Sequence, residues 1–429
     1  MFGGNEKLTE KWAPVLNHED APKIESRYKA AVTAKLLENQ EVALAEEASH
    51  AGFALQENNL AGGGAGLGTV GQAFDPVLIS LVRRAMPNLM AYDIAGVQPM
   101  SAPTGLIFAM KSQYQVAGAN DSEALFDEAD TAFSGTGTHG GDTDGPFGGT
   151  DTTPADGIND AFVTGTGMTT ADGEVKTPED MGFSIERTAV EAKTRTLRAE
   201  YSMELAQDLK AVHGLDAEAE LANILSAEIL AEINREIVRD VNTQAKLGAA
   251  TGNTAANGTF DLETDADGRW SAEKYKGLVM QIEREANQIA LETRRGKGNF
   301  LIVSSDVASA LAASGVLDYA PAAGDISSDV TGSTFAGVLN GRMKVYIDPY
   351  AATDYCTVGY RGTNPYDAGY FYCPYVPLTM VRAVDANTFQ PKIGFKTRYG
   401  KVANPFVSGA VRANTYFRSF RVSGILTNA

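Results

Sequence analysis

Hydrophobic residues recur every three or four positions over residues 217–242, and this spacing predicts the clearest helix of the chain. Asp216 immediately precedes the stretch and is the expected N-cap residue. At about 1.5 Å per residue, such a helix is roughly 39 Å long and could form the backbone of a domain. Its predicted buried stripe consists of Leu221, Ile224, Leu225, Ile229, Ile233, Ile237, Val238 and Val241.

A second helix is predicted over residues 271–295, beginning at a Ser271 cap and ending before Gly296. Residues 299–303 then predict a buried strand. Because helices and strands are mixed without a regular β-α-β alternation, we expect an α+β fold rather than a doubly wound parallel sheet. Further strand-and-turn structure is predicted at residues 335–384, with alternation at 343–347, and again at 415–426.

Residues 115–180 are rich in glycine, threonine and aspartate, and they contain few large apolar residues. Such a segment cannot bury enough apolar surface to offset the entropy lost on ordering. Short apolar stretches on either side, at residues 105–110 and 182–187, are typical of strands. We therefore expect a two-stranded extension with a glycine-rich tip.

The formal net charge is −18, and its distribution is uneven. Residues 121–180 hold 14 acidic residues and one lysine, or −13, which leaves −5 for the rest of the chain. Without clustered lysine and arginine, a nucleic-acid-binding surface is not expected. Five aspartates among the glycines suit calcium ligation in kind but lack its regular nonapeptide period, so a solvated loop is favoured: Asp142, Asp144, Asp151, Asp156 and Asp160.

Length and composition favour a globular protein of two or three domains, with 429 residues and 44% hydrophobic content. The sequence contains no run of about 18 apolar residues, and its start lacks the apolar segment of a secretory signal. We therefore expect no membrane insertion or export, and a location in the cytosol where the chain is made. Cys356 and Cys373 are too few for a disulfide framework and are expected to be buried free thiols.

Motifs that would indicate catalysis are weak or absent. The run from Gly66 to Gly71 matches G-x-G-x-x-G but follows further glycines instead of a strand, so a flexible arm is favoured over a dinucleotide site. No Gly-x-Ser-x-Gly elbow or carboxylate pair is evident. We predict no enzymatic activity, no cofactor and no metal site, since the four histidines also lack partners at ligand spacing: His18, His50, His139 and His213.

Residues 1–57 are rich in Glu, Lys, Ala and Leu with helical spacing, and they predict a charged, partly helical extension. The small residues 61–66 follow almost at once and mark a boundary, because glycine-rich backbone is costly to order.

Several segments resemble the major capsid proteins of T-even-type contractile-tailed bacteriophages. The first two are Val82-Arg83-Arg84-Ala85-Met86-Pro87-Asn88-Leu89 and Asp93-Ile94-Ala95-Gly96-Val97-Gln98-Pro99-Met100. The likeness continues in the same order over most of the chain, except in residues 115–180, where that family carries a larger insertion. Further matching segments are Lys11-Trp12-Ala13-Pro14, Glu232-Ile233-Asn234-Arg235-Glu236 and Gly394-Phe395-Lys396-Thr397-Arg398-Tyr399-Gly400.

This resemblance implies a Hong Kong 97-like capsid fold, in which a long spine helix supports a peripheral domain beside an axial domain. The regions that it implies are a cleaved propeptide (1–57), an N-terminal arm (58–95), an extended loop (96–200) with its acidic insertion (115–180), the peripheral domain with the spine helix (201–264), the axial domain (265–384) and a return to the peripheral domain (385–429).

The resemblance also implies a processing site. Prohead proteases of T-even-type phages cut after Leu-x-Glu or Ile-x-Glu, and Leu55-Gln56-Glu57 stands just before the glycine-rich boundary, which predicts cleavage between Glu57 and Asn58. The same tripeptide pattern at Leu8, Leu36, Leu44 and Leu230 shows that it also arises from a helix rich in Leu and Glu.

The expected function is a structural subunit that self-assembles into hexameric capsomers of a phage head, icosahedral or prolate, in the host cytoplasm. Expected partners are neighbouring capsomers, the capsid vertex protein, scaffold proteins, the prohead protease, decoration proteins and, non-specifically, packaged DNA. Three alternatives stay open: a pentameric vertex protein of the same fold, a shell that encapsulates enzymes, and an acidic calcium-binding surface or adhesion protein.

Overall fold

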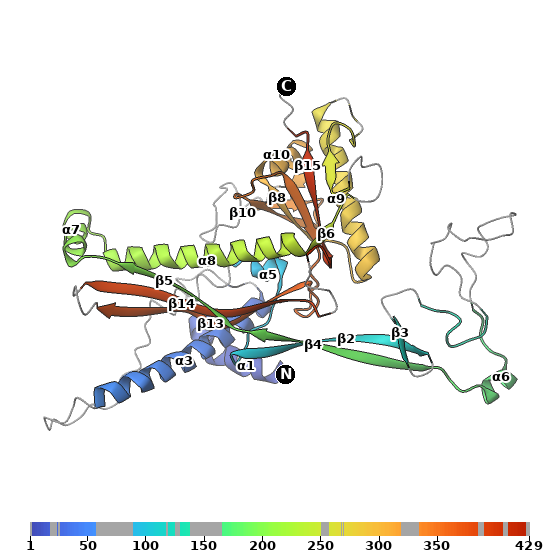
Figure 1. The fold of residues 1–429 in the computed structure, drawn as a ribbon, viewed down its shortest axis with the longest axis horizontal. Coiled ribbons are helices and arrows are strands. Elements are labelled where there is room, and N and C mark those ends of the chain that lie inside the picture. Colours follow the sequence, from blue (N-terminus) through green and yellow to red (C-terminus); the bar gives the residue numbers. More distant parts are fainter. Residues whose placement is uncertain are drawn as a thin grey trace. The chain divides into compact units, whose positions relative to one another are not determined.

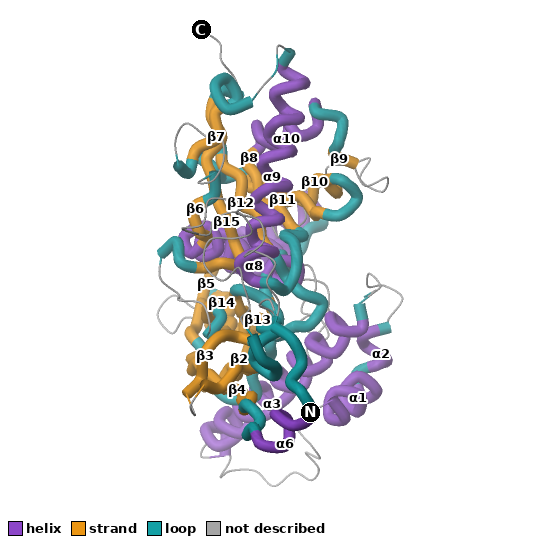
Figure 2. Tube along the Cα trace, turned by 90° about the vertical axis from the view of Figure 1, so that its right-hand side faces the viewer, coloured by secondary structure: helices purple, strands orange, loops and turns teal. Residues whose placement is uncertain are grey.

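The computed structural model forms two compact units, Met1–Ile107 with Thr188–Ala429 and Phe108–Arg187. Figures 1 and 2 show the elements of both. The residues that the structure describes are 2–17, 24, 26–56, 89–116, 119–124, 129–137, 165–249, 257–266, 268, 270–318, 334–384, 390–405 and 411–425.

The predicted long helix is α8, Ala217–Gln244 (Figure 1). The Asp216 carboxylate accepts a hydrogen bond from the Glu218 N–H at 3.1 Å, so the predicted cap is confirmed. The prediction for Ile224 is wrong, because its side chain is 61% exposed on the outer side of the first turns. The rest of the predicted stripe is buried apart from the half-buried Leu221, and consists of Leu225, Ile229, Ile233, Ile237, Val238 and Val241.

A four-stranded sheet packs against α8 through β5 and β14, and its strand order is β1-β13-β14-β5. The pairing of β13 with β14 is antiparallel and shifts register between Pro374 and Val376 and again before Thr379. Proline lacks a backbone donor, which accounts for an interrupted ladder at this point. The strands are β1 Gly96–Val97, β13 Tyr370–Val384, β14 Pro391–Ala403 and β5 Lys193–Glu200.

A second sheet has the order β6-β15-β12-β8-β11-β10-β9, with β7 also paired to β15. Its centre is the predicted buried strand, β8, Phe300–Ser304, in which every residue is buried. The helices α9, Ser271–Thr293, and α10, Ser305–Ala313, pack against it. The other strands are β6 Ala245–Leu247, β7 Thr259–Asp261, β9 Leu317–Asp318, β10 Thr334–Leu339, β11 Met343–Asp348, β12 Tyr355–Gly359 and β15 Asn414–Ser423.

The ends of α9 differ from the prediction by one or two residues. The N-cap is Trp270 instead of Ser271, because the Glu273 carboxylate accepts a hydrogen bond from the Trp270 N–H at 3.4 Å. The helix stops at Arg294, which adopts a left-handed conformation with φ of 52°, so the chain turns before Gly296 is reached.

The N-terminal region is helical, as predicted, and it also belongs to the core. Its helices are α1 Phe2–Lys11, α2 Ala13–Leu16 and α3 Arg27–Gln56. α1 packs on α3, and α3 packs on β13. Buried residues of this region share one apolar cluster with the α8 stripe and with α5, Ala91–Ile94: Trp12, Leu16, Val32, Leu36 and Leu37.

The second unit contains most of a three-stranded sheet with the order β3-β2-β4. The predicted strands on either side of the acidic segment are confirmed as β2, Thr104–Val116, and β4, Asp180–Glu191. β3, Ala119–Glu123, and the short helix α6, Thr170–Val175, complete the unit. All five aspartates that were considered as calcium ligands lie outside the described residues.

The mixed α+β class is confirmed, and Cys356 and Cys373 are buried free thiols as predicted. No helix within the described ranges has the length and apolar character needed to cross a membrane. The division of the chain into six regions stays a prediction, and residues 58–88 of the expected arm lie outside the described residues.

Candidate functional site

One polar face of α8 carries ion pairs that join this helix to β5 and β14 of the four-stranded sheet. Arg195 on β5 contacts the carboxylates of Glu232 and Glu236 at 2.7 and 2.6 Å. Its Nε also donates to the Tyr399 hydroxyl at 2.6 Å, and that hydroxyl donates to Glu236. The i, i+4 spacing of Glu232, Glu236 and Asp240 places all three carboxylates on one helix face.

Glu236 is the centre of this cluster. Its second oxygen lies 2.6 Å from Lys401 Nζ, and Lys401 also pairs with Asp240. Burial raises the pKa of the Glu236 carboxyl, but the hydrogen bonds from Lys401, Tyr399 and Arg195 outweigh burial and lower this pKa to about 2. The cluster therefore holds Glu236 ionised at any pH near neutrality, where it fastens α8 to β5 and β14.

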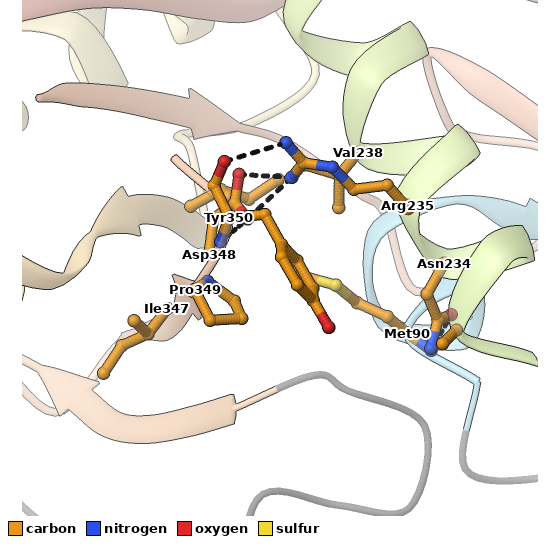
Figure 3. A pocket seen from close by; sticks show the side chains of 10 residues that line it. Met90, Asn234, Arg235, Val238, Ile347, Asp348, Pro349 and Tyr350 are labelled. Carbon is orange, nitrogen blue, oxygen red and sulfur yellow. Dashed lines mark hydrogen bonds and ion pairs between the residues drawn. The ribbon is translucent and has the colours of Figure 1, made fainter. Parts of the chain in front are cut away.

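A small pocket lies where α8 meets the end of β11 (Figure 3). One Arg235 nitrogen is 2.6 Å from both carboxylate oxygens of Asp348, and the other donates to the Tyr350 carbonyl at 3.3 Å. The Tyr355 hydroxyl also donates to Asp348 at 2.7 Å. These hydrogen bonds join α8 to the second sheet through Asp348 at the end of β11. Its remaining lining residues are Met90, Ala231, Asn234, Val238, Ile302, Ile347 and Pro349.

The N-terminal helices bind the rest of the first unit along a seam formed by α3, β13 and residues 89–100. The Tyr28 hydroxyl donates to the Val97 carbonyl. The Asn39 amide donates to the Met100 carbonyl at 2.7 Å and to the Tyr375 carbonyl at 2.9 Å. α3 therefore contacts both segments at the point where residues 96–100 run beside β13.

Some apolar side chains are left uncovered within each unit. In β4, Met181, Phe183 and Ile185 alternate along the strand and are all exposed, so they share one sheet face. The helix α7, Met203–His213, is amphipathic but buries none of its residues, and Leu205 and Val212 are exposed. Contiguous exposed apolar surface is typical of protein interaction sites.

The predicted processing site falls at the limit of the described structure. Leu55 and Gln56 form the last turn of α3, whereas Glu57 and Asn58 lie outside the described residues. The other four Leu-x-Glu tripeptides, at Leu8, Leu36, Leu44 and Leu230, all lie within helices. Among them, Glu38 is bound by Lys11 and by the Trp12 indole N–H, at 2.8 and 3.1 Å. Leu230 is buried in α8.

Sequence reasoning missed most members of the ionic cluster. Arg195 and Tyr399 are 204 residues apart, and no periodic pattern links residues on different strands. The i, i+4 spacing of the acidic residues in α8 does not identify their partners on other strands. Within the described ranges no group of three or more histidine, cysteine or acidic side chains could hold a metal ion.

Comparisons with known proteins find similar sequences among phage capsid proteins. The major capsid protein of Vibrio phage KVP40 is 39% identical over 513 aligned positions, which cover 97% of this chain and 100% of that protein. The major capsid protein of Enterobacteria phage T4 is 38% identical over 98% of this chain and 99% of its own length. The T4 capsid vertex protein is more distant, at 29% identity over 53% of this chain and 54% of its own.

Two solved capsid structures align with this chain at low TM-scores. The capsid of the myovirus phage XM1 has a TM-score of 0.39 and 10% identity, covering 78% of this chain and 92% of that one. The capsid of an empty GTA particle has a TM-score of 0.37 and 14% identity, covering 86% and 98%. The family described as "Major capsid protein Gp23" matches residues 71–422, which is most of the sequence, and the chain therefore belongs to that family of phage head proteins.

Proposed function

We propose that the chain forms the hexameric capsomers of a tailed-phage head. The observation that carries this proposal is the difference between the two kinds of relative. Major capsid proteins are 38–39% identical over nearly the whole chain, whereas the pentamer-forming alternative, a capsid vertex protein, is 29% identical over about half of it. The uncovered apolar faces of β4 and α7 are suited to contacts between copies.

The arrangement that we propose is the Hong Kong 97-like one. In it, α8 is the spine helix, β2 and β4 form the extended loop, and the four-stranded sheet belongs to the peripheral domain. The second sheet with α9 and α10 is the natural candidate for the axial domain. Family membership and the order of these elements support this assignment.

We further propose that the prohead protease removes residues 1–57 by cutting between Glu57 and Asn58. Two features support this site. Leu55-Gln56-Glu57 matches the Leu-x-Glu pattern, and the scissile bond precedes the glycine-rich residues 61–66. Proteases bind extended backbone, which such a boundary supplies more readily than a helix interior.

Other proposed partners are scaffold proteins during assembly, the capsid vertex protein, decoration proteins and packaged DNA without sequence preference. We also propose that the chain has no catalytic activity of its own, since the family is structural. Family membership weighs against an adhesion protein and an enzyme-encapsulating shell.

Two measurements test the proposal. Electron microscopy of the protein expressed alone should show capsomers, tubes or shells with sixfold units. Mass spectrometry of mature particles should find a chain that begins at Asn58. Five-membered rings alone would support the vertex protein, a lasting monomer would contradict self-assembly, and a full-length chain in mature heads would contradict the processing site.

A further inference from the structure

The strands of the four-stranded sheet carry mostly positive charge. Glu200 is their only acidic residue, although the whole chain has a formal net charge of −18. The cations come from strands that are far apart in the sequence, so they form no basic cluster along the chain. They are Lys193, Arg195 and Arg198 in β5, Arg382 in β13, and Lys392, Lys396, Arg398 and Lys401 in β14.

The positive charges on one face of this sheet are neutralised by α8, which lies along one side of β5 and β14 (Figure 1). Arg195, Lys401 and Arg382 each contact carboxylates of α8. β5 and β14 pair in unbroken register, and successive side chains of a strand point to opposite faces. The residues between these contacts therefore lie on the other face, which α8 does not cover.

That other face carries a row of four cations. Three belong to β14, at Lys392, Lys396 and Arg398. The fourth, Arg198 of β5, lies directly opposite Gly394, the one position of the β14 row that has no side chain. One cation therefore stands at every second residue along the strand pair, at intervals of about 7 Å over roughly 20 Å.

This row is open to solvent and only partly neutralised. The Arg198 side chain is 76% exposed, and Lys396 is exposed with no ion-pair partner in the part of the chain that the structure describes. Glu200 lies on the same face and is shared by Lys392, at 2.9 Å, and Arg198, at 3.6 Å. Four positive charges thus face one carboxylate from the same strands.

Three features favour phosphates over carboxylates as the ligand of this row. The cations are evenly spaced, as phosphates along a nucleic-acid strand are, whereas the aspartates within residues 138–164 stand at irregular intervals. The exposed Thr194 and Thr196 lie on the same face, and threonine hydroxyls are common phosphate donors. The Arg398 guanidinium lies 5.2 Å from the centre of the Tyr375 ring, which holds it in place before a ligand arrives.

We propose that this face of the sheet, formed by Arg198, Lys392, Lys396 and Arg398, binds the phosphate backbone of nucleic acid without reading its sequence. This assignment rests on the proposed contact with packaged DNA and gives that contact a surface. A row of cations on a sheet face contacts phosphates and not base edges, so binding is weak and depends steeply on salt. Residues 121–180, with a net charge of −13, repel the same ligand.

Fluorescence anisotropy of the full chain with a short, labelled DNA duplex of mixed sequence tests the proposal. With four phosphate contacts, the dissociation constant should rise about 100-fold between about 50 and 200 mM sodium chloride. Replacing two exposed cations together, Arg198→Gln with Lys396→Gln, should reduce this rise to about tenfold. Absence of binding at the lower salt concentration, or an unchanged salt dependence in the double variant, would overturn the proposal.

Lys276→Gln is the matched control, because it removes an exposed lysine from α9 and should leave the binding of DNA unchanged. Thr196→Lys adds a cation within the row and should steepen the salt dependence. Equal losses from Lys276→Gln and Lys396→Gln would show that DNA responds to overall charge and not to this face, which contradicts the proposal.

A synthetic peptide of residues 138–164 is the competing probe. If the peptide bound to this face and DNA did not, the face would be a contact between copies and the proposal would be wrong. Electron microscopy of the same preparations separates this result from the proposed function. Particles that form normally but bind no DNA would refute the role of this face alone, whereas protein that forms no capsomers or shells would contradict self-assembly.

Discussion

α8 and α3 are both long helices that pack against the four-stranded sheet, yet their polar contacts with it differ in kind. In α8, the buried Asn234 accepts a hydrogen bond from the Met90 N–H at 3.1 Å, and Glu236 has several partners. In α3, Tyr28 and Asn39 instead donate hydrogen bonds to the backbone carbonyls of Val97, Met100 and Tyr375. Hydrophobic burial holds both helices; charged side chains add to the contact of α8 with the sheet, and neutral side chains add to that of α3.

The largest effect that would sharpen this comparison is expected from Ile233→Asp. Ile233 is 1% exposed in the centre of α8, and an unpaired carboxylate there should lower the free energy of unfolding by more than about 5 kcal/mol. We expect insoluble protein and no particles by electron microscopy.

Ile224→Asp is the matched control for this change. It lies in the same helix but on the exposed side, so stability should change by less than about 0.5 kcal/mol. Soluble, particle-forming Ile233→Asp protein would show that this face of α8 is not buried.

A smaller and more local effect is expected from Leu36→Ala in α3. The cavity should cost about 2–5 kcal/mol, and the loss should fall on the seam. Hydrogen exchange measured by mass spectrometry should become faster in residues 27–43 and 89–100 while α8 stays protected. Equal acceleration in α8 would mean that the two helices form one cooperative unit, and the comparison would fail.

Acidification should weaken the α8 contact. The pKa of Glu236 is about 2 in the folded protein and lies below the ordinary value of 4.5, so the folded state favours its ionised form. This contribution is complete above pH 4.5 and is lost as the pH falls towards 2. We expect it to be about 1–2 kcal/mol, because partial exposure of the side chain allows screening by water.

Urea unfolding at a series of pH values measures this contribution. Glu236→Gln should be less stable near neutral pH and should lose less stability on acidification than the unmodified chain. An unchanged dependence on pH would show that Glu236 is not held in its ionised form by the cluster.

The smallest effect is expected in the second unit, from replacing residues 138–164 by a short Gly-Ser turn. The Thr136 N–H donates to the Thr166 carbonyl at 2.9 Å and the reverse bond is 2.8 Å, so the two ends already lie side by side. Stability should change by less than about 0.5 kcal/mol, and particles should still form. If assembly were abolished while the subunit stayed folded, this acidic segment would be a contact between subunits.

The sequence predicted elements best where one local period determines burial. The buried stripe of α8 and the buried strand β8 follow from the spacing of hydrophobic residues alone. The prediction that Ile224 is buried was wrong, because spacing does not show how far along the helix its packing partners extend. Arg195, Glu236 and Tyr399 could not be assembled into a cluster, because strand pairing between residues 193–200 and 391–403 has no local signature. Residues 1–57 were expected to be helical, but nothing in their pattern indicated that Leu36 and Leu37 enter the main core.

The hydrogen bond from Asn39 to the Tyr375 carbonyl joins residues 336 positions apart, and this separation has a consequence during synthesis. A ribosome that adds about 5–20 residues per second makes β13 roughly 20–70 seconds after α3. Throughout that interval the apolar face of α3 has been translated but its binding site has not. The newborn N-terminal segment is therefore available to other molecules before it is available to its own chain, and the host's chaperones or an earlier-made copy can meet it first.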